Sequence, residues 1–401
     1  MDDRLTRYAR LAVKVGLNLQ PGQTLLINAM IEHAPLARAI AREAYAAGAR
    51  YVDVTYTDQH VRKEHIAGAS DEMLGFSPPW SVQRLRDLGE SAGALCAISG
   101  NPEPQLFADL DGDRVARSRP REVAEASLEL SGGKSNWTIV AYPNEGWAQT
   151  VFGEPDVERL WDAVASATRL DADDPVAAWQ EHMARLSARA EGLNERRFDH
   201  LHYRGPGTDL RIGLHPDSVW ESASMTSNGI THVPNMPTEE VFTCPDARRV
   251  DGTVRSTLPL QIQGTIVNRL EIRFEGGRAV DVRAESGESL MQTHIATDEG
   301  AARLGEVALV DRTSAVGKTG LVFYDTLFDE NASSHIALGD GFPENVPSAH
   351  ELSPEERHEP GVNHSSIHTD FMIGSDELEV DGVSGSGERV PILRHGEWQL
   401  R

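Results

Sequence analysis

Acidic and imidazole side chains recur beside apolar segments in the second half of this sequence, although such groups are rarely buried without a partner or a metal. In the segment 366–374, strand alternation places His368 and Asp370 on one face and Ile367 and Phe371 on the other. An imidazole and a carboxylate that project together from a half-buried strand can bind a first-row metal ion. For this segment alone, a His–Asp hydrogen bond on a solvated face is the more ordinary interpretation.

Three further segments carry the same residue types. Glu306 lies within an apolar run, so its charge needs either a cation or an exposed position at a helix end. Glu239 and Glu240 are adjacent, so an extended backbone turns only one of them toward a given site, and a solvated acidic pair is the competing interpretation. His335 precedes another apolar run, and a single histidine in that position is more often structural.

Together these segments supply three carboxylates and two imidazoles but no thiolate. This oxygen-rich set is typical of a hydrolase with a dinuclear zinc, cobalt or manganese site. The two cysteines, Cys96 and Cys244, are too few for a disulfide framework or for a zinc site with several thiolates. Any metal ion must therefore be held by oxygen and imidazole ligands.

Charge and hydropathy narrow the partners that this chain can have. The 38 basic and 62 acidic residues give a formal net charge of −24, which disfavours nucleic acid and anionic membrane surfaces and favours solubility. The sequence begins with a charged, amphipathic segment rather than a signal peptide, and it has no apolar run of membrane-spanning length. We therefore expect a cytoplasmic protein without membrane or nucleic-acid partners.

The first half of the sequence alternates short apolar runs with a helical pattern. Residues 24–28 and 51–56 have the composition of buried strands, and the alanine-rich segment 34–47 between them has that of a helix. This is a β–α–β unit, which predicts a parallel sheet covered by helices. Further buried strands are expected at residues 92–99 and 137–141.

A long polar helix is expected at about residues 174–197, and the pattern of apolar and polar residues changes after it. Residues 210–214 and 270–284 alternate apolar and polar side chains, as antiparallel strands do. We therefore predict two domains: an α/β domain with a parallel sheet at 1–197, and an α+β, largely antiparallel catalytic domain at 198–401.

Four ordered motifs in the second half resemble the thermophilic aminopeptidases, also called the M29 metallopeptidases. The opening helix and the Pro21–Gly22–Gln23 turn also fit, so the resemblance covers essentially the whole chain. The motifs are Pro-Thr-Glu-Glu-Val-Phe-Thr at 237–243, Gly-Glu-Val-Ala-Leu at 305–309, the stretch 330–337 that contains Glu-Asn-Ala and His-Ile-Ala, and Ile-His-Thr-Asp-Phe-Met-Ile-Gly at 367–374.

This resemblance implies a site, a reaction and an assembly. The family removes N-terminal amino acids from peptides with two divalent ions, here zinc, cobalt, manganese or magnesium, and forms homodimers whose N-terminal domains help to enclose the site. One carboxylate, Glu306, is expected to bridge the two ions. The positions that match the family's metal ligands are Glu240, Glu306, His335, His368 and Asp370.

The expected mechanism is attack by a metal-activated water on the scissile carbonyl. Glu239 is a candidate for carrying the proton from the water to the leaving amine, and orientation of the metal site is its alternative role. A free peptide N-terminus is a cation, so an acidic pocket favours exopeptidase action.

One residue departs from the family pattern. A tyrosine that helps to stabilise the oxyanion is common seven positions after the motif histidine, and here Phe342 stands at that position. Loss of one oxyanion donor typically costs about 10²–10³ in rate. Two alternatives follow: hydrolysis of a non-peptide amide on the same scaffold, and a catalytically impaired homologue that acts as a binding dimer.

Overall fold

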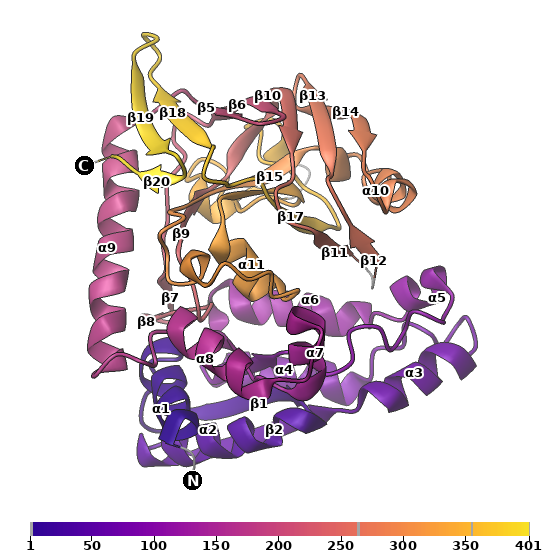
Figure 1. The fold of residues 1–401 in the computed structure, drawn as a ribbon. Coiled ribbons are helices and arrows are strands. Elements are labelled where there is room, and N and C mark those ends of the chain that lie inside the picture. The colour runs from indigo at the N-terminus through magenta and orange to yellow at the C-terminus, as the bar shows by residue number, and fades with distance from the viewer. Residues whose placement is uncertain (1–2, 263–264, 354–355, 401) are drawn as a thin grey trace. The chain divides into compact units, whose positions relative to one another are not determined.

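The computed structural model describes residues 3–262, 265–353 and 356–400 of the chain (Figure 1). The chain divides into two compact units. The first comprises Met1–Glu181 and Ser224–Pro237, and the second comprises His182–Ala223 and Thr238–Arg401.

The first unit is built on the parallel sheet that the β–α–β pattern predicts. Its strands lie in the order β2-β1-β3-β4, and every pairing is parallel. Leu25 and Ile27 of the interior strand β1 are fully buried, as expected where helices cover a parallel sheet. The strands are β1 (Thr24–Met30), β2 (Tyr51–Thr57), β3 (Ala94–Ser99) and β4 (Asn136–Ala141).

Helices cover this sheet, and their ends follow from local sequence signals. Helix α2, for example, has a proline in its first turn, and Gly48 just beyond its end has φ +95°, a conformation that favours glycine. The segment Ser224–Pro237 adds a hairpin of β7 (Met225–Ser227) and β8 (Ile230–His232). The helices are α1 (Asp3–Leu11), η1 (Ala12–Gly16), η2 (Ile31–His33), α2 (Ala34–Ala46), α3 (Gln59–Gly68), α4 (Pro79–Glu90), α5 (Gly112–Arg117), α6 (Arg121–Glu129), η3 (Leu130–Lys134), α7 (Glu145–Phe152), α8 (Val157–Ala167) and the first turns of α9 (Pro175–Arg196).

The second unit contains a large antiparallel sheet, in agreement with the predicted α+β class. Eight strands lie in the order β14-β13-β10-β6-β5-β18-β19-β20, and their pairings are all antiparallel. The strands are β5 (His200–Gly205), β6 (Thr208–Leu214), β10 (Pro245–Arg255), β13 (Glu271–Glu275), β14 (Arg278–Arg283), β18 (Glu379–Val383), β19 (Arg389–Arg394) and β20 (Glu397–Trp398).

A second, smaller sheet in this unit carries the acidic and histidine residues that the sequence suggests as metal ligands. Its strands lie in the order β17-β16-β15-β9 and pair antiparallel. They are β9 (Glu240–Thr243), β15 (Leu304–Val310), β16 (His335–Gly339) and β17 (His368–Met372). The remaining elements are β11 (Leu260–Ile262), β12 (Thr265–Val267), α10 (Glu288–His294), η4 (Gly300–Ala302), η5 (Gly317–Thr319), α11 (Thr326–Ala332), η6 (Pro343–Asn345) and η7 (Glu356–His358).

One hydrophobic core joins the two sheets of the second unit. Val307, Ile336 and Phe371 of the small sheet belong to the same buried cluster as Leu210 and Ile212 of the large sheet. One face of the small sheet is therefore apolar and packed, which leaves the opposite face for the polar side chains.

Helix α9 is the long helix predicted at residues 174–197, and the boundary of the two units falls inside it. Leu186, Ala190 and Leu193 in its later turns pack into the core of the second unit. The domain boundary at 197/198 stays a prediction, and the structure divides at His182 because these apolar side chains need that core.

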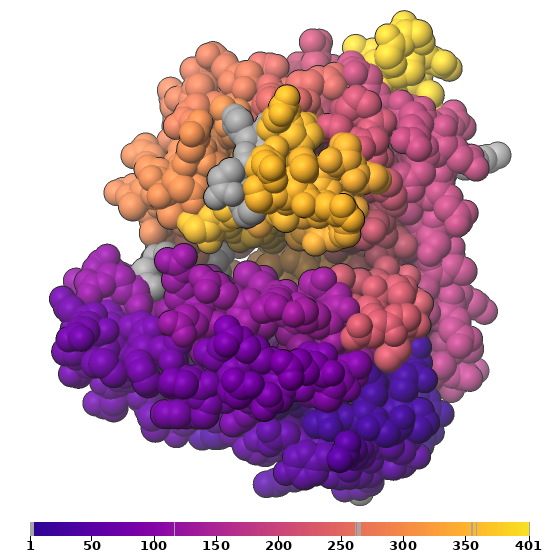
Figure 2. Space-filling view, turned by 180° about the vertical axis from the view of Figure 1, so that it is seen from behind, coloured from indigo at the N-terminus to yellow at the C-terminus, as the bar shows by residue number. Residues whose placement is uncertain are grey.

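Residues 341–360 are rich in proline, glutamate and histidine, and in their described part they lie at the surface of the second unit (Figure 2). Val346, Ala349 and Val362 pack against Cys244 and so anchor this segment. Among the described helices, none is both long enough and apolar enough to cross a bilayer.

Candidate metal centre

The register of the small sheet brings its acidic and imidazole residues to one face. Ala337 of the central strand β16 lies opposite both Glu306 of β15 and Asp370 of β17. Residues directly opposite in adjacent strands point to the same face, and so do residues two apart in one strand. Glu306 and Asp370 therefore share a face with His335, which lies two positions before Ala337.

The same rules place Glu240 and His368 on this face. Glu240 lies opposite Val310, which is four residues along β15 from Glu306. His368 lies two residues before Asp370 on β17. All the side chains expected to bind metal thus project from one surface, away from the apolar core.

A bulge in β15 helps to seat Glu306. The register between β15 and β16 shifts between Leu304 and Glu306. A Cβ atom on the intervening Gly305 would lie 2.1 Å from the carbonyl oxygen of Asp340, so only glycine permits this close approach.

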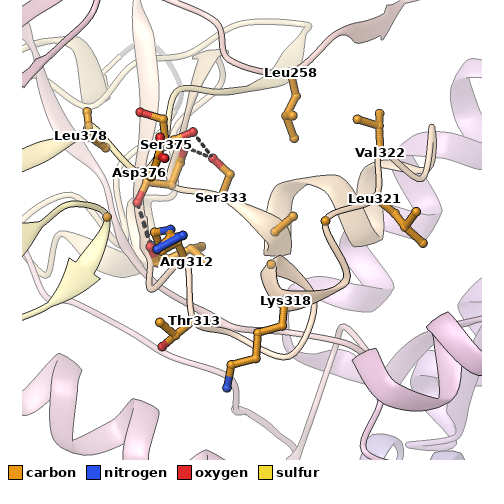
Figure 3. A pocket seen from close by; sticks show the side chains of 17 residues that line it. Leu258, Arg312, Thr313, Lys318, Leu321, Val322, Ser333, Ser375, Asp376 and Leu378 are labelled. Atoms are coloured by element: carbon orange, nitrogen blue, oxygen red, sulfur yellow. Dashed lines mark hydrogen bonds between the residues drawn. The ribbon is translucent and has the colours of Figure 1, made fainter.

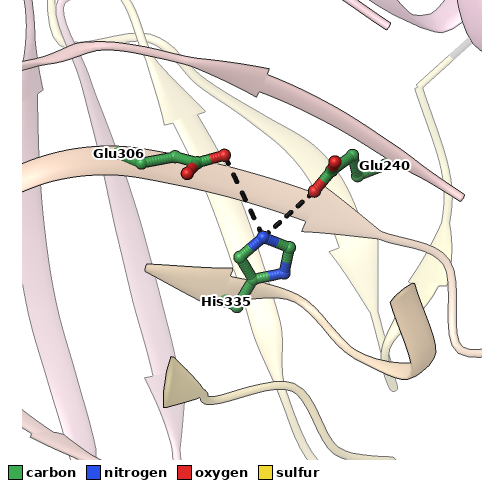
Figure 4. A group of neighbouring side chains, drawn as sticks. All are labelled: Glu240, Glu306 and His335. Atoms are coloured by element: carbon green, nitrogen blue, oxygen red, sulfur yellow. Dashed lines mark ion pairs between the residues drawn. The ribbon is translucent and has the colours of Figure 1, made fainter. Parts of the chain in front are cut away.

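Glu306 is the centre of the resulting cluster. Its Oε1 lies 4.0 Å from His335 Nε2, and its Oε2 lies 3.1 Å from His368 Nε2. His335 Nε2 is also 3.0 Å from Glu240 Oε2, and His368 Nε2 is 3.4 Å from Asp370 Oδ1. Figure 4 shows the His335 ring between Glu306 and Glu240, with an ion pair to each. The residues thus form two groups, Glu240–Glu306–His335 and Glu306–His368–Asp370, in each of which the potential ligand atoms lie within 4.8 Å of one another.

Backbone carbonyls orient both histidine rings. His335 Nδ1 donates to the carbonyl oxygen of Ser333 at 3.1 Å, and His368 Nδ1 donates to that of Asp340 at 2.8 Å. Each bond holds a proton on Nδ1 and turns Nε2 toward the carboxylates. This is the orientation in which imidazole binds a metal ion through Nε2.

Two carboxylate oxygens in the cluster lack the hydrogen bonds that buried oxygens normally accept. Glu240 Oε2 and Asp370 Oδ1 are buried, and each faces a histidine Nε2, at 3.0 and 3.4 Å, without forming a well-oriented hydrogen bond with a described residue. Leaving a buried polar atom unsatisfied is costly, and more so for a charged one. The donor set therefore fits divalent cations, which such oxygens and imidazole nitrogens would bind.

The electrostatics of the cluster show a deficit of positive charge. Burial raises the pKa of Glu306, and Asp370 and Glu240 add to this effect, which a hydrogen bond from His368 offsets only in part. Burial opposes the charged form of His335 and His368, yet the surrounding carboxylates outweigh it and raise the pKa of both well above the ordinary value. Protons on the histidines thus provide the positive charge that metal ions would supply.

Glu330 is a further acidic residue at this site, to which the sequence alone gave no role. It belongs to helix α11, and burial raises its pKa well above the ordinary value, with Asp370 and Glu240 adding to the rise. The sequence signal was its position inside the 330–337 motif, five residues before His335.

Glu239, the candidate proton carrier, lies outside both ligand groups. Its Oε1 accepts a hydrogen bond from the Ala315 amide at 3.2 Å, and its Oε2 is 3.5 Å from Nε2 of the buried His182. The Glu239 amide in turn donates to Asn331 Oδ1 at 2.7 Å. These contacts tie the segment before β9 to α9 and α11.

Phe342 lies beside the cluster. Its ring centroid is 5.1 Å from that of His368 and 5.6 Å from that of Phe242. An aromatic ring without a hydroxyl therefore occupies the position next to His368 where the family pattern predicts a tyrosine.

Asp298 anchors the loop that leads to His368. Its carboxylate accepts hydrogen bonds from the Ser365 hydroxyl at 2.8 Å and from the Ser366 amide and hydroxyl at 2.8 and 2.7 Å. A further bond comes from the Ala301 amide at 2.8 Å. Burial opposes the charge, but these bonds outweigh it and lower the pKa of Asp298 to about 2.

Comparisons with known proteins agree with this chemistry. The family model described as "Thermophilic metalloprotease (M29)" matches residues 1–398. Aminopeptidase T of Thermus aquaticus is 44% identical over 406 aligned positions, covering 99% of both chains. Aminopeptidase 2 of Geobacillus stearothermophilus is 41% identical, covering 99% of this chain and 98% of its own. The solved structure of wild-type AmpT from Thermus thermophilus superposes with a TM-score of 0.92 at 41% identity, covering 98% of each chain.

Metal binding is expected to release protons. Because the metal-free histidines have raised pKa values, they are protonated at neutral pH, and a divalent ion must displace the proton on Nε2. Metal affinity should therefore fall as the pH falls and rise as the pH increases through the raised pKa values. Calorimetric titration in buffers of different ionisation heat measures the protons released. Affinity that does not change with pH would contradict the assignment of both histidines.

Replacing Asp298 should weaken metal binding without unfolding the chain. In Asp298→Ala the Ser365–Ser366 turn loses its anchor, so His368 is held less firmly, and we expect roughly 10- to 100-fold weaker metal binding. Equilibrium dialysis measures the affinity. Asp58→Ala is the matched control, because Asp58 also accepts backbone hydrogen bonds, from His60 and Val61, but in the first unit. Equal metal affinity in both variants would refute the role of Asp298.

Proposed function

We propose that this chain, which belongs to the thermophilic metalloprotease family (M29), is an aminopeptidase that hydrolyses the bond after the N-terminal residue of peptides. The observation that carries the proposal is the arrangement around Glu306, whose two carboxylate oxygens each face a different histidine. A carboxylate shared in this way can bridge two cations.

The five clustered residues would then hold two divalent ions. Glu240 and His335 serve one ion, His368 and Asp370 serve the other, and Glu306 belongs to both. Zinc, cobalt, manganese and magnesium remain the candidates, because oxygen and imidazole donors accept all of them. Bound ions would supply an activated water and would polarise the scissile carbonyl.

The chain's own groups bind and orient the substrate and move the proton. The acidic cluster attracts the ammonium group of a free peptide N-terminus, which internal peptide segments lack. Glu330 is our candidate for the proton carrier, because it interacts electrostatically with Asp370 and Glu240 and its pKa is raised. A carboxyl whose pKa is raised holds a proton more readily than an ordinary carboxylate, as a proton carrier must.

Glu239 suits the other role that the sequence left open, orientation of the metal site. Its carboxylate is engaged by the Ala315 amide and faces His182, and it lies outside both ligand groups. The neighbouring residue Glu240 is thereby held at the start of β9. We assign Glu239 to positioning rather than to proton transfer.

Phe342 favours a second candidate function. A ring without a hydroxyl next to His368 removes one potential donor to the oxyanion, so hydrolysis of a non-peptide amide, or an impaired homologue that binds without turnover, stays the alternative.

Assembly as a homodimer is also a proposal, drawn from the family resemblance, and light scattering of the purified chain measures it.

Glu306→Gln should lose both bound metal and activity, because an amide cannot carry the charge that two cations share. Hydrolysis of a panel of aminoacyl chromogenic amides with added cobalt, zinc, manganese or magnesium measures activity, and elemental analysis measures retained metal. Activity of Glu306→Gln equal to that of the unchanged chain would refute the role of Glu306. No release from any panel member by the unchanged chain would favour the alternative functions.

Glu239→Gln is the matched comparison in the same assays. If Glu239 positions the metal site, Glu239→Gln should keep its full metal content and an unaltered pH profile. Its activity should fall by roughly 10- to 100-fold. Loss of one limb of the pH profile would instead identify Glu239 as the proton carrier.

Phe342→Tyr should raise the rate if the missing hydroxyl limits catalysis. A phenol next to His368 adds one donor for the oxyanion, and such a donor typically contributes about 10²–10³ in rate. The increase should appear in kcat rather than in KM, since the donor acts in the transition state. A kcat that does not rise would show that Phe342 costs this enzyme nothing.

A further inference from the structure

A cavity lies beside the metal centre in the second unit. Its volume is about 490 Å³, within the range of roughly 300–1,000 Å³ that small-molecule sites occupy. Figure 3 shows Asp376 and Leu378 on one side of it and Leu321 and Val322 on the other. Arg312, Thr313 and Lys318 line its remaining edge.

The floor of this cavity continues the face that carries the metal-binding residues. Ser333 has an extended backbone, with φ −156° and ψ 146°, and lies two positions before His335. Ser333 Oγ donates to the carbonyl oxygen of Gly374 at 3.1 Å, and the backbone amides of Ile373 and Gly374 donate to the Ser334 carbonyl oxygen, which extends the pairing of β16 and β17. Val310, also in the lining, lies opposite Glu240. Two extended residues span roughly 7 Å, so Ser333 in the lining lies about that far along the strand from His335.

The charges at the cavity differ from those of the metal centre. Arg312 and Lys318 contribute two cations to the lining, against the single carboxylate of Asp376. Glu397 lies 3.4 Å from the Arg312 guanidinium, but both side chains are about half exposed, so this pair is weak. Lys318 has no ion-pair partner among the described residues, and it is the only lysine after Lys134 in the sequence. The rim is therefore cationic in a chain of net charge −24.

We propose that this cavity binds the C-terminal carboxylate of a short peptide whose N-terminal amine lies at the metal centre. This proposal rests on the proposed aminopeptidase function. A free peptide has a cation at one end and an anion at the other, and the two regions offer the matching charges in the matching order. An extended peptide rises about 3.3–3.6 Å per residue, so a peptide of two or three residues spans the separation.

The lining of the cavity also limits which side chain the last residue of the peptide can carry. Leu258, Leu321, Val322 and Leu378 give the cavity apolar walls, while the hydroxyl of Ser375 offers a donor. An uncharged apolar side chain at the peptide's last residue fits these walls, and an acidic one would meet Asp376.

A labelling experiment tests the cavity without requiring turnover. The full, metal-loaded chain is treated with an amine-acylating reagent, and mass spectrometry follows each lysine, with or without N-acetyl-Gly-Gly or its C-terminal amide. These probes have no free amine, so they are not aminopeptidase substrates. We expect the free acid, but not the amide, to slow labelling of Lys318 roughly threefold or more. Lys14, Lys63 and Lys134 are internal controls that should not change. Equal protection by acid and amide, or none, overturns the proposal.

A kinetic comparison gives the second arm. With Leu-Gly-Gly and Leu-Gly-Gly amide as substrates, the free acid should have a KM roughly three- to tenfold lower, and Lys318→Met or Arg312→Gln should remove this difference. Leucine p-nitroanilide, which has no carboxylate, should be cleaved equally by all these forms, and Lys134→Met is the matched lysine control.

The two proposals fail in different ways. If no peptide or anilide is cleaved, the aminopeptidase function fails, and the labelling result still decides whether the cavity binds carboxylates. If both tripeptides are cleaved with the same KM by the unchanged chain, the cavity proposal fails while the aminopeptidase function stands.

Discussion

The burial of several carboxylates on one face of a small sheet is the constraint on which the rest of the structure depends. Glu240, Glu306 and Asp370 lie close together, and Glu330 adds a further negative group. Like charges in a desolvated site repel one another strongly unless a positive charge is added. In the metal-free chain the carboxylates raise the pKa of both histidines, and the protons that the histidines therefore hold supply this positive charge. Divalent cations would relieve the same repulsion more completely.

Such a cluster can persist because the opposite face of the sheet is firmly held. Val307, Ile336 and Phe371 alternate with the polar residues and are buried in the core that both sheets share. Because side chains alternate between the faces on either side of the bulge at Gly305, this packing fixes the register, and a slip of one residue would turn the ligands into the core. Hydrophobic burial therefore supplies the rigidity that costly polar placement requires.

Hydrogen bonds outside the cluster set the direction of its side chains. The carbonyl oxygens of Ser333 and Asp340 fix the two imidazole rings, and Asp298 anchors the turn that leads to His368. Glu239, next to Glu240, contacts the Ala315 amide and faces His182. The cavity with Arg312 and Lys318 is lined in part by Val310, at the end of β15, and by Ser334, just before β16.

The sequence by itself determined the local features of this protein. Period-two alternation placed His368 and Asp370 on one face, the β–α–β pattern predicted the parallel sheet, and the motifs identified the family. Only the tertiary structure decided which distant residues meet. It placed Glu306 between two histidines, turned Glu239 away from both ligand groups, and brought Glu330 and Phe342 to the cluster. The reason is physical: alternation is a property of neighbouring residues, whereas strand order and register depend on pairings between segments far apart in the chain.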